Sequence, residues 1–115
     1  MAGFESDRLK AEVWISSQIR LCGRLLLPVY VVRKGDPDAG TILIKRVFGM
    51  SGCEVLAQAR QADGSLSWVR ATGPAPVLES DAEVYIKRQA GFDPDIWVIE
   101  IEDPNGIYEP DGNIF

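Results

Sequence analysis

Four aspartates in two short loops are the residues of this chain best suited to chemistry. Asp36 and Asp38 stand on either side of one proline, and Asp93 and Asp95 on either side of another. Carboxylate oxygens bind magnesium or calcium, and two close carboxylates can share acid and base roles. Together these residues would suit a small divalent-metal-dependent hydrolase or phosphodiesterase. The competing interpretation is that each Asp-Pro-Asp segment is a structural turn whose carboxylates accept local backbone N–H groups.

A second set of candidates points to binding rather than catalysis. Tryptophan and arginine are enriched among the anchor residues of protein interfaces. Trp14 lies off the main apolar stripe of a predicted helix, while Trp68 and Arg70 alternate along a predicted strand. Glu100 belongs to the charged half of another strand. These four residues are candidates for contact with a protein partner or a second copy, although both tryptophans equally fit a buried core.

Several chemistries are absent from the sequence. The chain has no histidine, which excludes Ser-His-Asp triads, histidine-ligated zinc and imidazole proton shuttles. Its two cysteines, Cys22 and Cys53, stand alone and have the character of reduced structural thiols. The glycine-rich stretch at 35–40 lacks the phosphate-loop pattern. We therefore expect no cofactor.

Length and charge narrow the function further. With 115 residues, the chain has the size of a single domain, residues 1–115. Its 12 basic and 17 acidic residues give a net charge of −5, which disfavours nucleic acid and anionic lipid as partners. The longest apolar run, residues 25–32, is too short to span a membrane, and the acidic N-terminus does not resemble a secretory signal. These features predict a cytoplasmic protein.

The first element is a predicted helix at residues 6–22, which contain neither glycine nor proline. Its expected buried stripe is Ala11, Ile15, Ile19 and Cys22. Ser6 or Asp7 is expected to cap its start, and Gly23 to end it.

Four consecutive strands are predicted next, at residues 25–34, 41–48, 54–62 and 65–71. Pro28 assigns the first of them to an edge of the sheet or to a bulged position. The turn residues at 35–40 predict a hairpin between the first two strands. The Asp63-Gly64 pair predicts a two-residue turn between the last two.

A second helix is predicted at residues 81–90. Ser80 and Glu83 have the spacing of a capping box, and Gly91 is the expected C-cap. A last strand follows at 96–102. Residues 104–115 are acidic, contain proline and glycine, and are expected to form a loosely held tail.

This order, α-β-β-β-β-α-β, predicts an α+β fold with a mainly antiparallel sheet of about five strands and both helices on one face. In the last strand Trp97, Ile99 and Ile101 would face the helices. The other face would stay open, half apolar and half charged, with residues Ile96, Val98, Glu100 and Glu102.

The chain also resembles a family of short alphaproteobacterial proteins classed as a domain of unknown function. The resemblance extends in order over nearly the whole chain, through residues 8–14 (RLKAEVW), 33–40 (RKGDPDAG), 68–74 (WVRATGP), 85–89 (YIKRQ) and 92–103 (FDPDIWVIEIED). It implies a bacterial origin and a compact stand-alone domain, and nothing about mechanism.

The sequence therefore favours a small, non-enzymatic interaction or assembly module of the bacterial cytoplasm. It would work through an open sheet face or an exposed strand edge. The alternative is the metal-dependent hydrolase that uses Asp36, Asp38, Asp93 and Asp95.

Overall fold

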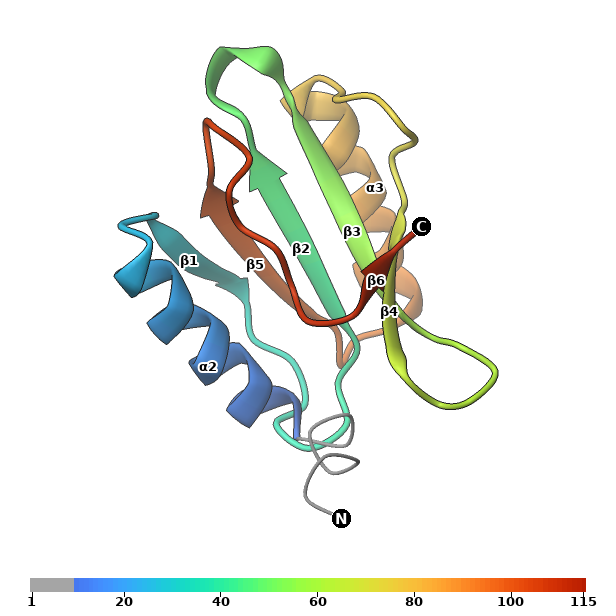
Figure 1. Ribbon diagram of the computed structural model, residues 1–115. Helices are drawn as coiled ribbons and strands as arrows, with labels where there is room; N and C mark the ends of the chain where they lie inside the picture. Colours follow the sequence, from blue (N-terminus) through green and yellow to red (C-terminus); the bar gives the residue numbers. More distant parts are fainter. Residues whose placement is uncertain (1–9) are drawn as a thin grey trace.

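The computed structural model describes residues 10–115 (Figure 1). Its elements are α2 (Ala11–Arg24), β1 (Val29–Arg33), β2 (Ile42–Val47), the 3-10 turn η1 (Gly49–Ser51), β3 (Cys53–Arg60), β4 (Leu66–Arg70), α3 (Glu79–Phe92), β5 (Trp97–Glu102) and β6 (Asn113–Ile114). The expected helix start at Ser6 or Asp7 lies outside the described residues. Within 10–115, neither helix has the length and apolar character needed to cross a bilayer.

The six strands form one mixed sheet in the order β1-β5-β2-β3-β4-β6. The α+β class is confirmed, but the prediction of a mainly antiparallel sheet is wrong: β5 runs parallel to β2, and β6 parallel to β4. The predicted hairpin between the first two strands is also wrong, because β5 lies between β1 and β2. The chain reaches β5 through α3, and a helical crossover can return a strand parallel to its neighbour.

The two helices cover opposite faces of the sheet, so their prediction on one face is wrong. The α2 face buries Trp14 and Ile15 against Ile44 and Ile99, and the α3 face buries Ile86 against Val98. Neighbouring strand residues point to opposite faces, so the strands supply apolar side chains to both cores. The supposed open face is thus covered in part by α3, which Figure 1 shows behind β3. Trp97, 3 % exposed, is confirmed as a core residue.

Three of the four residues of the predicted stripe of α2, Ala11, Ile15 and Cys22, are buried, and Ile19 is not. Trp14 and Gln18 are buried with Ala11 and Cys22, whereas Ile19 is 39 % exposed. The buried positions recur every three or four residues, as one helical face requires. The helix also continues past Gly23 to Arg24.

The predicted caps of α3 are wrong. The helix begins at Glu79 after Leu78, with no side-chain hydrogen bond to cap it, and it continues through Gly91 to Phe92. The Glu83 carboxylate accepts a hydrogen bond from Lys45, which is far away in the sequence. The Glu83 side chain, which the local pattern assigns to the cap, forms a long-range ion pair instead.

The hairpin of β3 and β4 is confirmed, with a longer turn than predicted. The Gln61 N–H donates to the Ser65 carbonyl at 2.9 Å, which leaves the three residues between them as the loop. The Asp63 carboxylate accepts the Ser65 N–H at 2.9 Å. Gly64 has a φ of +86°, a conformation that favours glycine.

The segment after β5, expected to be a loosely held acidic tail, is docked onto the α2 face. Tyr108 is fully buried there, and its hydroxyl donates to the Gln18 side chain at 2.8 Å. The Trp68 indole N–H donates to the Asp111 carbonyl at 2.6 Å. In Figure 1 the segment passes in front of β2 before it reaches β6, which pairs with β4. We call residues 103–112 the crossing segment.

Candidate functional site

The two aspartate loops meet through their backbones. The Asp36 N–H donates to the Asp95 carbonyl at 3.0 Å. The Asp36 carboxylate accepts the N–H groups of Asp38 and Ala39, at 3.1 and 2.7 Å, and the Asp93 carboxylate accepts the Asp95 N–H at 3.1 Å. The interpretation of both segments as structural turns is confirmed by these bonds.

The loops do not gather their carboxylates into a metal site. Within residues 10–115, the group of acidic side chains close enough to share a cation is Glu79, Glu83 and Glu100, which contains none of the four aspartates. The Asp38 carboxylate lies 3.5 Å from the exposed ammonium of Lys10. The arrangement therefore gives the metal-dependent hydrolase no observation in its favour.

The three glutamates already surround a cation, the ammonium of Lys45. Its Nζ lies 2.7 Å from Glu79, 2.6 Å from Glu83 and 3.3 Å from Glu100, and the lysine side chain is only 2 % exposed. Burial by itself would lower the pKa of Lys45, but the hydrogen bonds to Glu79 and Glu83 and the charge of Glu100 raise it above its ordinary 10.5. Lys45 thus stays charged near neutral pH and ties α3 to the sheet, which leaves it unsuited to act as a base or nucleophile.

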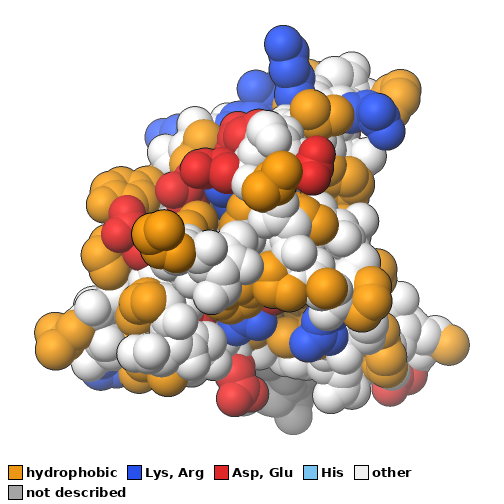
Figure 2. Space-filling model, turned by 90° about the horizontal axis from the view of Figure 1, so that it is seen from above, with side chains coloured by type: hydrophobic (Ala, Val, Ile, Leu, Met, Phe, Trp, Pro, Cys, Tyr) orange, Lys and Arg blue, Asp and Glu red, His pale blue; other side chains and the backbone are white. Residues whose placement is uncertain are grey.

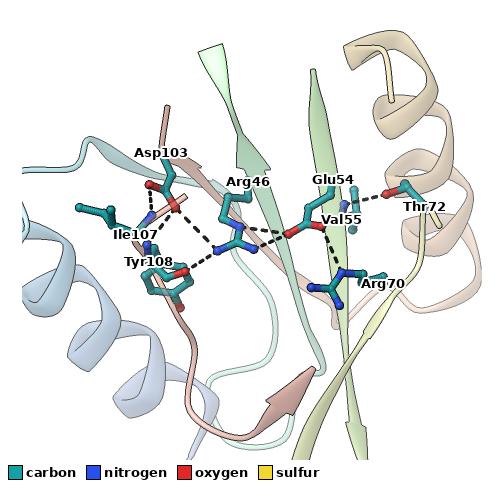
Figure 3. A network of polar contacts seen from close by, with 8 residues as sticks. All are labelled: Arg46, Glu54, Val55, Arg70, Thr72, Asp103, Ile107 and Tyr108. Atoms are coloured by element: carbon teal, nitrogen blue, oxygen red, sulfur yellow. Dashed lines mark hydrogen bonds and ion pairs between the residues drawn. The ribbon is translucent and has the colours of Figure 1, made fainter. Parts of the chain in front are cut away.

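A second charged network lies on the opposite face, one residue further along β2 (Figure 3). The buried Arg46 guanidinium donates twice to one Glu54 oxygen, from Nε at 3.0 Å and from Nη2 at 2.6 Å. Its Nη1 donates to the Tyr108 carbonyl and lies 3.7 Å from Asp103. Charge-assisted pairs of this kind are strong when desolvated and fully bonded. They attach the crossing segment to β2.

Asp103 anchors the start of that segment. It is fully buried, and its two carboxylate oxygens accept the N–H groups of Ile107 and Tyr108, each at 2.9 Å. At the far end of the network, Arg70 Nε lies 3.8 Å from Glu54 (Figure 3). The network satisfies its own charges and holds the chain in place.

The four predicted binding residues occupy different environments. Trp14 and Trp68 are 4 % and 0 % exposed, and their ring centroids lie 5.3 Å apart, so both pack in the core. Glu100 is half-buried beside Lys45. Arg70 lines a shallow hollow of about 410 Å³ with Gly73, Pro74 and Phe115. The structure does not bring these four side chains together on one surface.

Strand β1 presents a different kind of surface, along an edge of the sheet. It pairs only with β5 among the described residues, and Tyr30, Val31 and Val32 are 50, 43 and 55 % exposed. A β-bulge interrupts its register between Val31 and Arg33. The edge position predicted from Pro28 is confirmed. Figure 2 shows hydrophobic side chains spread over the view, including its left side, where Figure 1 places β1 and the end of α2.

The hydrogen-bond alternation shows which backbone groups of β1 point outward. The Glu102 N–H donates to the Pro28 carbonyl at 3.0 Å, so alternate residues of β5 turn their backbone groups toward β1. Tyr30, opposite Glu100, belongs to the same hydrogen-bonded set. Val29 and Val31 therefore direct their N–H and C=O groups away from β5, where no described residue pairs with them.

Leu26 lies just before this strand in an unfavourable conformation. The N–H groups of Leu26 and Leu27 donate to the carbonyls of Gly23 and Cys22, which is the Schellman ending of a helix. Glycine is preferred at the position that Leu26 occupies with a φ of +60°. Its side chain is 87 % exposed and contributes little to the core. A costly backbone conformation thus accompanies an apolar side chain that this chain does not bury.

The edge position of β1 follows from its sequence, but the exposure of its apolar side chains was not expected. A usable signal was present: residues 25–32 form an apolar run that is interrupted only by Pro28, the proline that assigns the strand to an edge. Edge strands are commonly protected by charge. The left-handed conformation of Leu26 could not be predicted from the sequence, because it depends on where α2 ends.

Comparisons with known proteins agree with this fold. A crystal structure of a DUF1491 family protein from Caulobacter crescentus is 32 % identical, with a TM-score of 0.84 over 93 % of this chain and 99 % of that chain. An NMR structure from the same organism gives 32 % identity and a TM-score of 0.82, over 94 and 97 %.

Protein Atu0922 from A. tumefaciens is similar in fold, with 24 % identity and a TM-score of 0.70 over 84 % of this chain and 86 % of that chain. No curated protein matches the chain. The family model described as "Protein of unknown function (DUF1491)" matches residues 9–108. The chain therefore belongs to the DUF1491 family, in agreement with its resemblance to short alphaproteobacterial proteins.

Proposed function

We propose that the protein is a non-enzymatic interaction module of the bacterial cytoplasm that binds a protein partner by strand addition along the outer edge of β1. The observation that carries this proposal is the combination of outward backbone groups at Val29 and Val31 with half-exposed apolar side chains at Tyr30 and Val32. In strand addition, main-chain hydrogen bonds supply affinity, and alternate side chains supply specificity.

The charged clusters support a binding role over a catalytic one. Lys45 and Arg46 are enclosed by carboxylates that they neutralise, so neither offers a reactive group to a substrate. The net charge of −5 favours a protein partner over nucleic acid. An apolar strand edge suits an extended segment of polypeptide.

Photo-cross-linking in living cells tests the proposal. The photo-reactive residue p-benzoylphenylalanine replaces Val32 in one variant and Val84, on α3, in a matched control, since these side chains are 55 and 56 % exposed. We expect discrete protein adducts from position 32 and none of comparable yield from position 84. Equal yields at both positions would contradict the proposal.

A second variant distinguishes strand addition from side-chain contact alone. Val31→Pro removes an outward N–H and leaves the hydrogen bonds of Tyr30 with β5 in place. Added to the position-32 variant, it is expected to abolish the adduct while circular dichroism shows a folded chain. An adduct that persists at full yield would overturn strand addition.

A further inference from the structure

We propose that the partner of β1 is a second copy of this chain, paired antiparallel about a two-fold axis at Tyr30. This inference rests on the proposed function of the β1 edge and goes beyond it by naming the partner and the register. The product would be a continuous sheet that extends through both copies.

The outward backbone groups select this register. With the axis at Tyr30, Val29 of each copy faces Val31 of the other, and both residues direct their N–H and C=O groups outward. Each such pair exchanges two hydrogen bonds, so all outward groups of the two valines are satisfied. An axis at Val31 would instead set Val29 against Arg33, which lies beyond the bulge and opposite Val98 of β5.

The side chains are complementary in the same register. Tyr30 meets the second copy's Tyr30 in a non-hydrogen-bonded pair, where side chains approach most closely. Aromatic cross-strand pairs stabilise a sheet, and so do pairs of β-branched residues such as Val29 and Val31. Val32 lies opposite the second copy's Pro28. The half-exposed residues of β1 would thus gain apolar neighbours.

The charges favour an antiparallel copy over a parallel one. Lys34 follows the end of β1, whereas Glu102 lies beside its start, with its backbone N–H bonded to the Pro28 carbonyl. The Arg33 guanidinium is already engaged, because it donates to the Pro94 carbonyl at 2.9 Å. An antiparallel copy brings the basic end of one strand next to the acidic end of the other, twice by symmetry. A parallel copy would set basic residues against basic residues, which is unfavourable.

The interface is short, which sets the expected affinity. A stable dimer commonly buries about 1,200 to 2,000 Å² in total. A five-residue strand and its flanks fall near or below the lower limit. We therefore expect a weak dimer that forms at about micromolar protein concentration or above. Because such a dimer dissociates on dilution, the first test traps it with a covalent bond.

Disulfide trapping tests partner and register together. A cysteine at Tyr30 would face its copy at about 4.5 Å between Cα atoms, within disulfide range, whereas cysteines at Val31 would lie diagonally at about 7 to 8 Å. The native Cys22 and Cys53 are buried, at 0 and 1 % exposed. In a glutathione redox buffer, Tyr30→Cys is expected to give at least about tenfold more disulfide dimer than Val31→Cys.

A light-scattering series on the unmodified chain accompanies the trap, because Tyr30→Cys removes the proposed aromatic pair. The wild type is expected to gain mass with concentration, and Val32→Lys is expected to stay monomeric. Equal yields of disulfide dimer from the two cysteine variants would contradict the proposed pairing of two copies. A wild type that stays monomeric at every concentration would contradict it as well. If position 32 still cross-links to another protein, the proposed function stands without this inference; if it cross-links no more than position 84, both fail.

Discussion

At one edge of the sheet the strand is β6, with the two residues Asn113–Ile114, whereas at the other edge β1 (Val29–Arg33) presents Tyr30, Val31 and Val32 about half exposed. The β6 edge is held from within: the crossing segment is fixed by Arg46 and Asp103, and the Phe115 N–H donates to the Trp68 carbonyl at 2.8 Å. A very short edge strand is one protection against unwanted pairing.

The β1 edge is protected less completely. Pro28 precedes the strand, a bulge distorts its end, and Arg33 is its last residue. These are known edge protections, but they leave Val29 to Val31 between them. Buried charges therefore hold the β6 edge in place, whereas the β1 edge keeps outward backbone groups and half-exposed apolar side chains. Mutations at the two edges should accordingly act on different properties.

The largest expected effect is on the closed edge. Trp68→Ala empties a fully buried site against Trp14 and removes the indole hydrogen bond to Asp111. We expect a loss of about 3 to 5 kcal/mol in the free energy of unfolding, measured by denaturant melts. Val32→Ala at the open edge is the control and should cost less than about 1 kcal/mol. Similar losses from the two variants would contradict the expected difference in stability between the two edges.

The crossing segment should respond next. Asp103→Asn keeps one acceptor but removes the charge that faces Arg46 and the second acceptor for the N–H groups of Ile107 and Tyr108. We expect a cost of about 2 kcal/mol, with faster amide exchange at Phe115, where β6 meets β4. Unchanged exchange at that amide would show that the buried network does not hold the closed edge.

Tyr108 gives this region a pH dependence. Burial raises the pKa of its phenol well above the ordinary 10.0. As the pH rises above about 10, the phenol ionises in the unfolded chain but keeps its proton in the folded one, so the free energy of unfolding falls. Tyr108→Phe should show a shallower fall than the wild type in urea melts at pH 9 to 11. Parallel curves would contradict this assignment.

The smallest stability effect belongs to the open edge and has the opposite sign. Leu26→Gly relieves the left-handed conformation of an 87 % exposed side chain. We expect a gain of about 0.5 to 1 kcal/mol in thermal or denaturant melts, after allowance for the greater freedom of glycine in the unfolded chain. A loss of stability would mean that Leu26 packs against this chain after all.

Local sequence patterns predicted the positions of the helices and strands better than they predicted which strands lie side by side. Alternation located the strands, and Pro28 placed β1 at an edge, because both signals depend on neighbouring residues. The position of β5 between β1 and β2 depends on where α3 crosses the sheet, and no local pattern encodes it. The apolar residues of the second face were visible, but they were interpreted as an open surface when α3 covers them.

The candidate site was harder to predict for the same reason. Glu83 fitted a capping box by spacing, yet its partner is Lys45, 38 residues away. Trp14 and Trp68 were suitable anchors by residue type, but their contact in the core joins distant segments. The structural role of the aspartate turns was predictable, because the first carboxylate of each segment, Asp36 or Asp93, bonds to backbone N–H groups within three residues.

Amide hydrogen exchange along β1 observes the outward backbone groups themselves and therefore shows whether they pair with a second copy. We expect the N–H groups of Val29 and Val31 to exchange quickly in dilute protein and to become protected as the protein concentration rises from about micromolar to about millimolar. The Tyr30 N–H, which faces β5, should exchange slowly throughout. Rapid exchange at Val29 and Val31 at every concentration would contradict the pairing of β1 with a second copy.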